Sequence, residues 1–276
     1  MSRVRVVAII PARMASSRFP GKPLLKVAGL PMIEHVRRRT VLCGRFSEVV
    51  VATCDAEIAE VVRGYGGMCL MTSPTHPGAS DRVAEAARQL ACTHVVNVQG
   101  DEILVRPDDL SRLLDAITEA PAVPAWNAVA RIRRPEELHD RSVVKCAISG
   151  SGRMMFCVRE FSRIPLDAGG GFEPIRIVLG ILGYRRDFLD RYPMLARTPL
   201  EQAEAIDQSR ILEHDIPLHS VEFAEGYPGI NEPREVALVE HYLQKDSAQQ
   251  AILRQVLEFV TERLPQPRPV AEGVRG

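Results

Sequence analysis

The chain has 276 residues, of which 46% are hydrophobic and 25% charged, a composition typical of an enzyme with one large domain and room for a smaller lobe. Lysine plus arginine and aspartate plus glutamate each total 35, so bulk charge supports neither a nucleic-acid nor a membrane partner. No apolar run reaches the roughly 18–20 residues of a membrane helix, and none resembles a cleaved signal, which predicts a cytoplasmic protein.

The first half of the chain alternates strand and helix patterns. Six of the seven residues 4–10 are apolar, which predicts a strand buried on both faces that ends at Pro11. Such alternation predicts an α/β fold with a parallel sheet covered by helices. Further strands are expected at 48–52, 68–71 and 94–98, and helices at 32–39 (with a basic outer face), 55–65 and 80–90 (with Ser80 as N-cap).

The second half is less regular and predicts a mixture of strands and helices. A hairpin is expected at Ser149–Gly152, and residues 167–173, with three consecutive glycines, are expected to form a mobile loop. Thr198, Pro199 and Glu201 predict the start of a helix that runs to about His214, because threonine caps and Glu201 can close a capping box. The expected strands are 126–132, 143–149, 154–158, 175–184 and 217–221, with one last helix after Pro233.

The loop after the first strand carries Arg13, Arg18 and Lys22 and no acidic residue. A buried parallel strand that runs into a cationic loop is a common place for a phosphorylated ligand, whereas a basic loop without that context is as often only solvated. The loop has neither G-x-x-x-x-G-K-[ST] nor G-x-G-x-x-G, which excludes a P-loop and a dinucleotide fingerprint.

Gln99, Gly100, Asp101 and Glu102 follow the buried strand at 94–98. A carboxylate at the carboxyl end of such a strand faces the ligand crevice and is suited to bind Mg²⁺ beside substrate phosphates. The alternative is a helix N-cap, but the next helix pattern begins later, near Pro107.

Several of these motifs together resemble the cytidylyltransferases that make CMP-3-deoxy-manno-octulosonate (CMP-KDO synthetases). The matching pieces run in order from residue 4 to about residue 240. They are Ile9–Arg13, Ser17–Leu24, Val51–Thr53, Asp81-Arg82, Val96–Glu102, Val144-Lys145, Gly180-Ile181, Gly183–Arg185, Thr198–Glu201 with Glu204, Gln208 and Arg210, and Pro228-Gly229.

The resemblance implies a Rossmann-like nucleotidyltransferase with a mostly parallel sheet and a smaller α+β lobe for the acceptor and for homodimerisation. It implies CTP and a small acidic acceptor as partners and Mg²⁺ as cofactor. The implied parts are a CTP-binding core (1–125), the lobe (126–222), a return to the core with C-terminal helices (223–263) and a flexible tail (264–276).

The resemblance also assigns roles to individual residues. Those implied for CTP are Pro11, Ala12, Arg13, Ser17, Lys22, Thr53, Ser80, Arg82 and Gln99. Those implied for the acceptor are Lys145, Arg159, Tyr184, Glu201, Glu204 and Gln208, although the spacing of Glu201, Glu204 and Gln208 alone favours a solvated helix face. Arg13, Arg18, Lys22 and Asp101 would carry catalysis, and Asp101 and Asn231 would contact the metal.

Departures from the family pattern concentrate on the acceptor side. Asn231 stands where the family has a metal-binding aspartate, Val178 where it has a histidine, and Cys54 where it has an aspartate. A phosphonate such as phosphonoformate is already an anion and needs no base, so we predict that CMP is transferred to a phosphonate. KDO or a related keto-sugar acid is the alternative, and a non-catalytic CTP-binding relative is another. A sugar-1-phosphate nucleotidylyltransferase fits less well, because its G-x-G-[ST]-R loop is absent.

Overall fold

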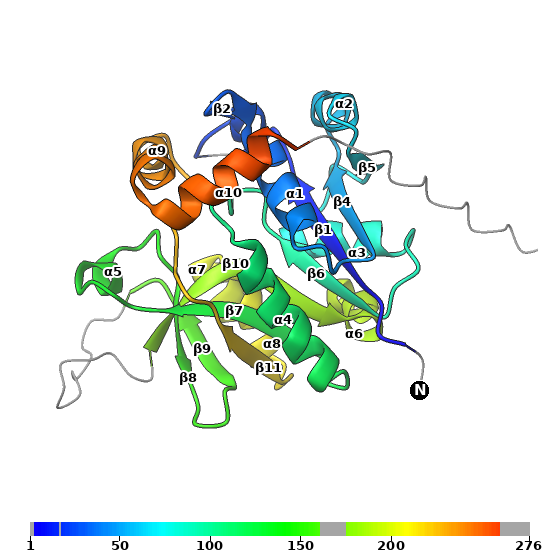
Figure 1. Ribbon diagram of the computed structural model, residues 1–276. Coiled ribbons are helices and arrows are strands. Elements are labelled where there is room, and N and C mark those ends of the chain that lie inside the picture. The colour runs from blue at the N-terminus through cyan, green and yellow to red at the C-terminus, as the bar shows by residue number, and fades with distance from the viewer. Residues whose placement is uncertain (1–2, 17, 161–174, 260–276) are drawn as a thin grey trace, which may run out of the picture.

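The computed structural model describes residues 3–16, 18–160 and 175–259. Within these ranges a single large sheet runs through the molecule with helices on both faces (Figure 1). Its strands are β1 (Val6–Ala12), β4 (Glu48–Thr53), β5 (Met68–Met71), β6 (His94–Val98), β7 (Ala125–Arg131), β8 (Lys145–Ile148), β9 (Met154–Val158), β10 (Ile175–Arg185) and β11 (Leu218–Glu222).

The sheet is mostly parallel, as predicted. Its main path is β11-β7-β10-β6-β1-β4-β5, and β8 and β9 extend it from β10. β1 pairs in parallel with β4 and β6, whereas β10 lies antiparallel between β6 and β7. A separate short pair, β2 (Lys26–Val27) and β3 (Leu30–Pro31), follows the single turn η1 (Lys22–Leu24). Strands from the two halves of the chain therefore share one sheet.

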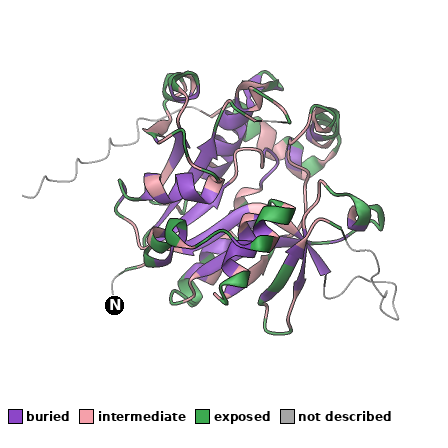
Figure 2. Ribbon diagram, turned by 180° about the vertical axis from the view of Figure 1, so that it is seen from behind, coloured by how far each residue is buried: buried purple, intermediate pink, exposed green. Residues whose placement is uncertain are grey.

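Two apolar layers enclose the sheet, and buried residues concentrate in its central strands (Figure 2), whereas β5, β9 and β11 at its margins are partly exposed. One layer joins the sheet to α1 (Met32–Leu42), α2 (Ala56–Gly64) and α4 (Pro107–Glu119). The other joins it to α3 (Ala79–Ala87), α6 (Arg186–Arg191), η2 (Tyr192–Met194) and α8 (Asp207–Glu213). A third, smaller cluster connects α1 to α9 (Glu235–Lys245), and α10 (Ser247–Leu257) packs on both helices. The short helix α5 (Glu136–His139) joins the first layer through Leu138, whereas α7 (Pro199–Glu204) contributes none of the described residues of these clusters.

The first strand extends further than its sequence predicts. Pro11 and Ala12 still belong to β1 and pair with β4, so the prediction that Pro11 ends the strand is wrong. β6 stops pairing with β1 at Ile9, so the missing N–H of Pro11 removes no hydrogen bond on that side.

The predicted basic outer face of the helix at 32–39 is also wrong. Arg37, Arg38 and Arg39 are all buried, since α10 packs over α1. Glu34 accepts from Arg37 Nε at 2.7 Å and from Arg38 Nε at 3.1 Å, so two of the three guanidinium groups share one carboxylate.

Two helix boundaries differ from the predicted ones. The N-cap of α3 is Gly78, and Ser80 lies inside the helix, where its hydroxyl contacts the Tyr184 hydroxyl at 2.9 Å. The predicted helix from Thr198 to His214 is two helices, α7 and α8, because Ala205 adopts a left-handed backbone (φ 53°). The capping interaction at the start of α7 is present, since Thr198 N donates to Glu201 Oε2 at 3.3 Å.

The predicted mobile loop at 167–173 and the tail at 264–276 lie outside the described residues. Among the residues that are described, no helix combines the length and the apolar character needed to cross a bilayer.

Candidate active site

Two adjoining hollows lie at the ends of β1 and β6. The smaller, of about 230 Å³, is lined by residues of the loop after β1 and by the start of α3, and we call it the small pocket. The larger, of about 940 Å³, reaches from there to the start of α8 and α9, and we call it the large cavity. Both are lined by Arg13, Arg18, Gly78, Ala79, Gln99 and Asp101, so they form one continuous site.

Most residues predicted to hold CTP line the small pocket. They are Pro11, Ala12, Arg13, Lys22, Arg82 and Gln99. Thr53 and Ser80 are buried beside it and do not appear in its lining, and Ser17 lies outside the described residues. His76, which the sequence did not single out as a site residue, also lines the small pocket and pairs with Glu85.

The cationic loop after β1 is closed by its own backbone. Met14 O accepts from Ser16 N at 2.9 Å and from Gly21 N at 3.0 Å, and Met14 N donates to Asp55 Oδ2 at 2.8 Å. Gly21 adopts φ 74°, a left-handed conformation that favours glycine, and it turns the chain into η1. The loop therefore presents Lys22 at a defined place.

Lys22 joins the loop after β1 to the loop after β6. Its Nζ donates to Asp101 Oδ2 at 2.7 Å and to Ile230 O at 3.0 Å. Asp101 O in turn accepts from Ile230 N at 3.2 Å. A Cβ on Gly229 would lie 2.8 Å from Asp101 O, so this close approach requires glycine. The segment that carries Asn231 is thus fixed beside Asp101.

The loop after β6 presents two neighbouring carboxylates. α4 begins only at Pro107, so Asp101 does not cap it, in agreement with the sequence. Glu102 Oε1 accepts from Gly180 N at 2.6 Å, and burial, together with the nearby Asp101 charge, raises the pKa of Glu102 to about 7. The sequence motif contained Glu102, but only the cavity reveals it as a lining residue.

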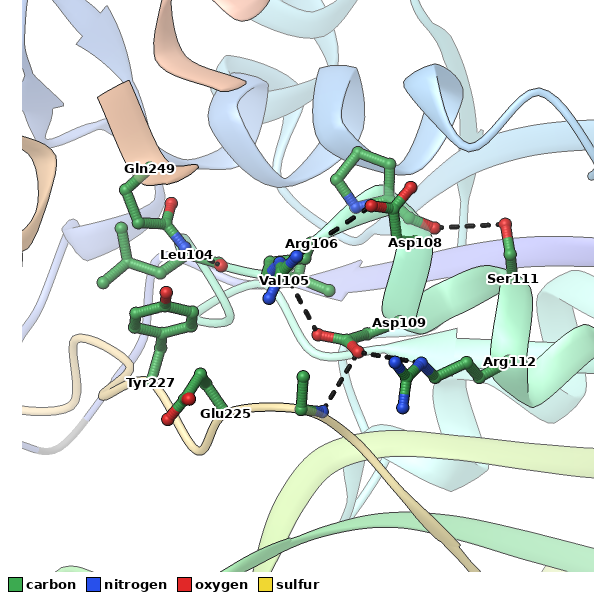
Figure 3. A network of polar contacts seen from close by, with 12 residues as sticks. Leu104, Val105, Arg106, Asp108, Asp109, Ser111, Arg112, Glu225, Tyr227 and Gln249 are labelled. Atoms are coloured by element: carbon green, nitrogen blue, oxygen red, sulfur yellow. Dashed lines mark hydrogen bonds and ion pairs between the residues drawn. The ribbon is translucent and has the colours of Figure 1, made fainter. Parts of the chain in front are cut away.

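The back of the same loop is held by one buried amide, that of Gln249 (Figure 3), and by a buried guanidinium. Gln249 of α10 donates to Leu104 O at 2.9 Å and accepts from Arg39 Nη1 at 2.7 Å. Arg39 Nη1 also donates to Val105 O at 3.2 Å. The C-terminal helix therefore supports the loop that carries Asp101.

Of the residues predicted to bind the acceptor, some line the large cavity and others do not. Arg159 and Gln208 line the large cavity, whereas Lys145, Tyr184, Glu201 and Glu204 are not among its lining residues. Lys145 is fully buried and donates to the carbonyl oxygens of Asp140 and Val143, both at 2.8 Å, and of Arg159.

Glu201 and Tyr184 belong to a buried polar network behind the cavity. Glu201 Oε1 accepts from Arg210 Nη2 at 2.5 Å and from Arg197 Nε at 3.0 Å. The Tyr184 hydroxyl contacts Ser80, and burial raises the pKa of Tyr184 above its usual value. Glu204 Oε2 accepts from the backbone N–H of Arg159 at 3.2 Å.

Two carboxylates meet at Gly78, and we call Asp81 and Asp207 the acidic pair. A Cβ on Gly78 would lie 3.0 Å from Asp81 Oδ2 and 3.2 Å from Asp207 Oδ2. Arg210 Nη1 approaches Asp81 Oδ1 at 3.4 Å, while Asp81 Oδ2 is buried without a hydrogen-bond partner among the described residues. Burial and the neighbouring Asp81 charge raise the pKa of Asp207, which lines the large cavity. No spacing in the sequence pairs these residues, which lie 126 positions apart along the chain (207 − 81).

The residues suited to Mg²⁺ are few. Within the described ranges no group of three or more His, Cys, Asp or Glu side chains is arranged around one point. Asp101 offers a carboxylate, and Asn231 Oδ1, which accepts from Arg18 Nη2 at 3.4 Å, offers a neutral oxygen. Because Mg²⁺ is commonly held by one or two carboxylates together with substrate phosphates, this donor set fits it.

Comparisons with known proteins agree with the fold. A cytidylyltransferase family model matches residues 7–218. The 3-deoxy-manno-octulosonate cytidylyltransferases of Geobacter sulfurreducens and Myxococcus xanthus are 38% and 40% identical, over 86% and 87% of this chain and 98% and 97% of theirs. A solved CMP:2-keto-3-deoxy-manno-octonic acid synthetase complexed with CTP superposes with a TM-score of 0.81 at 33% identity, covering 88% of this chain and 99% of that one. The chain therefore belongs to the cytidylyltransferase family and is a nucleotidyltransferase enzyme.

Proposed function

We propose that this enzyme transfers CMP from CTP to a hydroxyl group of 3-deoxy-manno-octulosonate or a closely related keto-sugar acid and releases pyrophosphate. The observation that carries the proposal is the unequal charge of the two ends of the site. The small pocket gathers Arg13, Arg18 and Lys22, which suit a triphosphate. The large cavity adds Asp207 of the acidic pair, which lies beside Gly78 and suits hydroxyl donors.

The acidic pair also weighs against a doubly charged acceptor. Asp81, Asp207 and Glu201 lie around one guanidinium, that of Arg210, so three carboxyl groups meet a single positive charge. A keto-sugar acid brings one carboxylate, for which Arg159 and Arg197 line the same cavity, and several hydroxyls. The relatives that match this chain over nearly their whole length are named for 3-deoxy-manno-octulosonate, which further supports this choice.

A pyrophosphate-release assay with CTP, Mg²⁺ and a panel of acids tests the proposal. The panel contains 3-deoxy-manno-octulosonate, other keto-sugar acids, phosphonoformate and a blank without acceptor. We expect turnover with the keto-sugar acid and none with the phosphonate. Turnover of phosphonoformate alone would overturn the proposal.

A phosphonate acceptor is the second candidate, and Asn231 favours it. An amide near the reacting phosphates repels an anionic acceptor less than the family's aspartate would. For a phosphonate enzyme, Asn231→Asp should raise the acceptor KM about three- to tenfold, because one extra charge at partly screened distance costs about 1 kcal/mol. For a keto-sugar enzyme, the same variant should leave that KM within about twofold, and Asn231→Ser controls for the loss of the amide. Steady-state kinetics with each acceptor decide between the two.

We infer that Mg²⁺ acts at this site with Asp101 as its protein carboxylate. When bound, the ion would supply charge neutralisation for the triphosphate and the leaving pyrophosphate. Lys22, Arg13 and Arg18 would orient the phosphates around it. Asp101→Asn should weaken the response of CTP binding to added Mg²⁺, which calorimetry measures without turnover.

We propose that the enzyme acts as a homodimer in the cytoplasm. Met155 and Phe156 of β9 are 59% and 41% exposed, and they lie on the strand that ends the β8–β9 extension of the sheet. Light scattering at micromolar concentration tests the dimer, and Met155→Glu should produce monomer. All six cysteines are free thiols, as a reducing compartment would keep them.

A further inference from the structure

β10 contains a bulge beside the large cavity. Between Val178 and Leu182, four residue steps along β10 face only two along β7. The bulge places Gly180 against the end of β6, where its N–H donates to Glu102 at 2.6 Å and its oxygen accepts from Gln99 N at 2.8 Å. An irregular stretch of this kind interrupts the ladder, so its carbonyl groups need other donors.

Asn127 of β7 supplies those donors. Its side chain is fully buried, and its Nδ2 donates to Leu179 O at 2.9 Å and to Ala128 O at 2.7 Å. Its Oδ1 accepts from Gln208 Nε2 at 2.8 Å. One amide therefore connects the bulge of β10 to the start of α8, which lines the large cavity.

The three contacts also fix which way both amides face. Carbonyl oxygens can only accept, so the NH₂ group of Asn127 must point to Leu179 and Ala128 and its oxygen to Gln208. Gln208 must then present its NH₂ group to Asn127. The carbonyl oxygen of Gln208 is left as the group that can accept a hydrogen bond from a hydroxyl in the cavity.

We propose that Asn127 is a positioning residue for the acceptor, which holds the amide of Gln208 in one orientation relative to the β10 bulge. The inference rests on the proposed function, because it assumes an acceptor whose hydroxyl meets Gln208. Asn127 touches no substrate itself, since it does not line either hollow. No motif marked it in the sequence, where it is one residue of an apolar strand.

A double-mutant cycle tests the proposal, with Asn127→Ala, Gln208→Ala and the double variant. The KM for the acceptor, the KM for CTP and the Tm are measured for each, with the acceptor that the panel identifies. Asn127→Ala should raise the acceptor KM about three- to tenfold, as expected for one hydrogen bond, and leave the CTP KM within about twofold. In the Gln208→Ala background, the same substitution should no longer change the acceptor KM.

Two outcomes would overturn the proposal. The first is an equal effect of Asn127→Ala with and without Gln208, which indicates a purely structural role. The second is a rise in the CTP KM with the acceptor KM unchanged. If Asn127→Ala does not fold, Gln208→Glu removes the donor and keeps both backbone contacts of Asn127, and an unchanged acceptor KM for it would count as failure. Failure of the proposed function is seen separately, in the acceptor panel, if the enzyme turns over no keto-sugar acid.

Discussion

At the scale of single residues, Lys22 connects three segments that are far apart in the chain. Its ammonium group contacts Asp101 and Ile230 O, and it lines the small pocket beside Arg13 and Arg18. The same charge therefore serves two purposes, since it neutralises Asp101 in the free enzyme and is available to phosphate oxygens.

Lys22→Met should lower kcat/KM for CTP about 10- to 100-fold, because a hydrogen bond to a charged group is worth about 1.5–3 kcal/mol. Lys26→Met is the matched control, since Lys26 is an exposed lysine four residues later. Steady-state kinetics at saturating acceptor measure both. Equal activity of the two variants would contradict the role given to Lys22.

His35 gives the molecule a specific sensitivity to acid. The side chain is fully buried, its Nε2 lies 2.7 Å from Val27 O, and burial lowers its pKa to about 4. In the unfolded chain the pKa is about 6.5, so the unfolded state binds the proton first as pH falls. The stability contributed by neutral His35 is complete above pH 6.5 and is lost between about pH 6.5 and 4.

His35→Gln should remove this part of the acid sensitivity, which amounts to at most about 3 kcal/mol for a difference of 2.5 pKa units. Urea titrations at pH 7.5 and pH 4.5 give the difference for each protein. His241→Gln, at an exposed position in α9, should retain the wild-type difference. An identical loss of stability in His35→Gln and wild type would contradict the assignment.

At the scale of elements, the break between α7 and α8 shapes one wall of the cavity. Arg159 Nε donates to Glu204 O at 2.7 Å and its Nη2 to Ala205 O at 3.2 Å. These are carbonyl groups that a continuous helix would use for its own N–H groups four residues later. An arginine directly after β9 therefore replaces two helical hydrogen bonds, and Asp207 and Gln208 of the next helix line the cavity.

Ala205→Gly should stabilise the protein by about 0.5 kcal/mol, because glycine relieves the left-handed strain but loses more backbone entropy. Ala203→Gly, in the exposed part of α7, should destabilise it by about 0.8–1 kcal/mol. Thermal unfolding of both variants should shift Tm in opposite directions, by about 1–4 °C each. A decrease for both would contradict the strain at Ala205.

These elements show where the sequence suffices and where it does not. The strands and the capping box at Thr198 and Glu201 depend on neighbouring residues, so local patterns predicted them. The break at Ala205 could not be predicted, because alanine favours helix and the arginine that ends it comes from residue 159. The buried face of α1 was missed for the same reason, since the helix that covers it lies some 210 residues further along the chain.

The candidate site also has a part that local motifs predict and a part that depends on residues far apart in the chain. The small pocket is built mainly from short stretches that directly follow β1 and β6, so contiguous motifs identified Arg13, Lys22, Gln99 and Asp101. The acceptor side combines α3, β7, β10 and α8 through buried polar contacts. There, Asp207 and Asn127 had no local signal, and Lys145 was assigned to the acceptor although its ammonium group serves backbone carbonyls.

At the scale of the whole molecule, the C-terminal helix supports the loop that carries Asp101 from behind. Gln249 links Leu104 O to Arg39, and Asp109 holds Ala224 N at 3.1 Å and approaches Arg112 Nε at 3.6 Å (Figure 3). The loop with Asp101 is thereby held between α10 and the segment that leads to Asn231.

Gln249→Ala should lower the free energy of unfolding by about 2 kcal/mol, because Leu104 O loses its partner and the Arg39 guanidinium loses another acceptor in the interior. The Tm should fall by about 4–8 °C and the CTP KM should rise. Gln255→Ala, at an exposed position of the same helix, should change neither quantity. A lower Tm with an unaltered CTP KM would show that the contacts of Gln249 stabilise the fold but do not affect CTP binding.

β10 has a consequence for how the chain can be divided. It comes from the second half of the sequence, yet it fills the place between β6 and β7 at the centre of the sheet. A fragment that stopped at residue 125 would expose the hydrogen-bonding edge of β6 that β10 covers. Such an unpaired edge promotes pairing with other chains and aggregation. The first 125 residues are therefore not expected to fold as an independent unit, and changes in the second half must preserve the strand on which the first half depends.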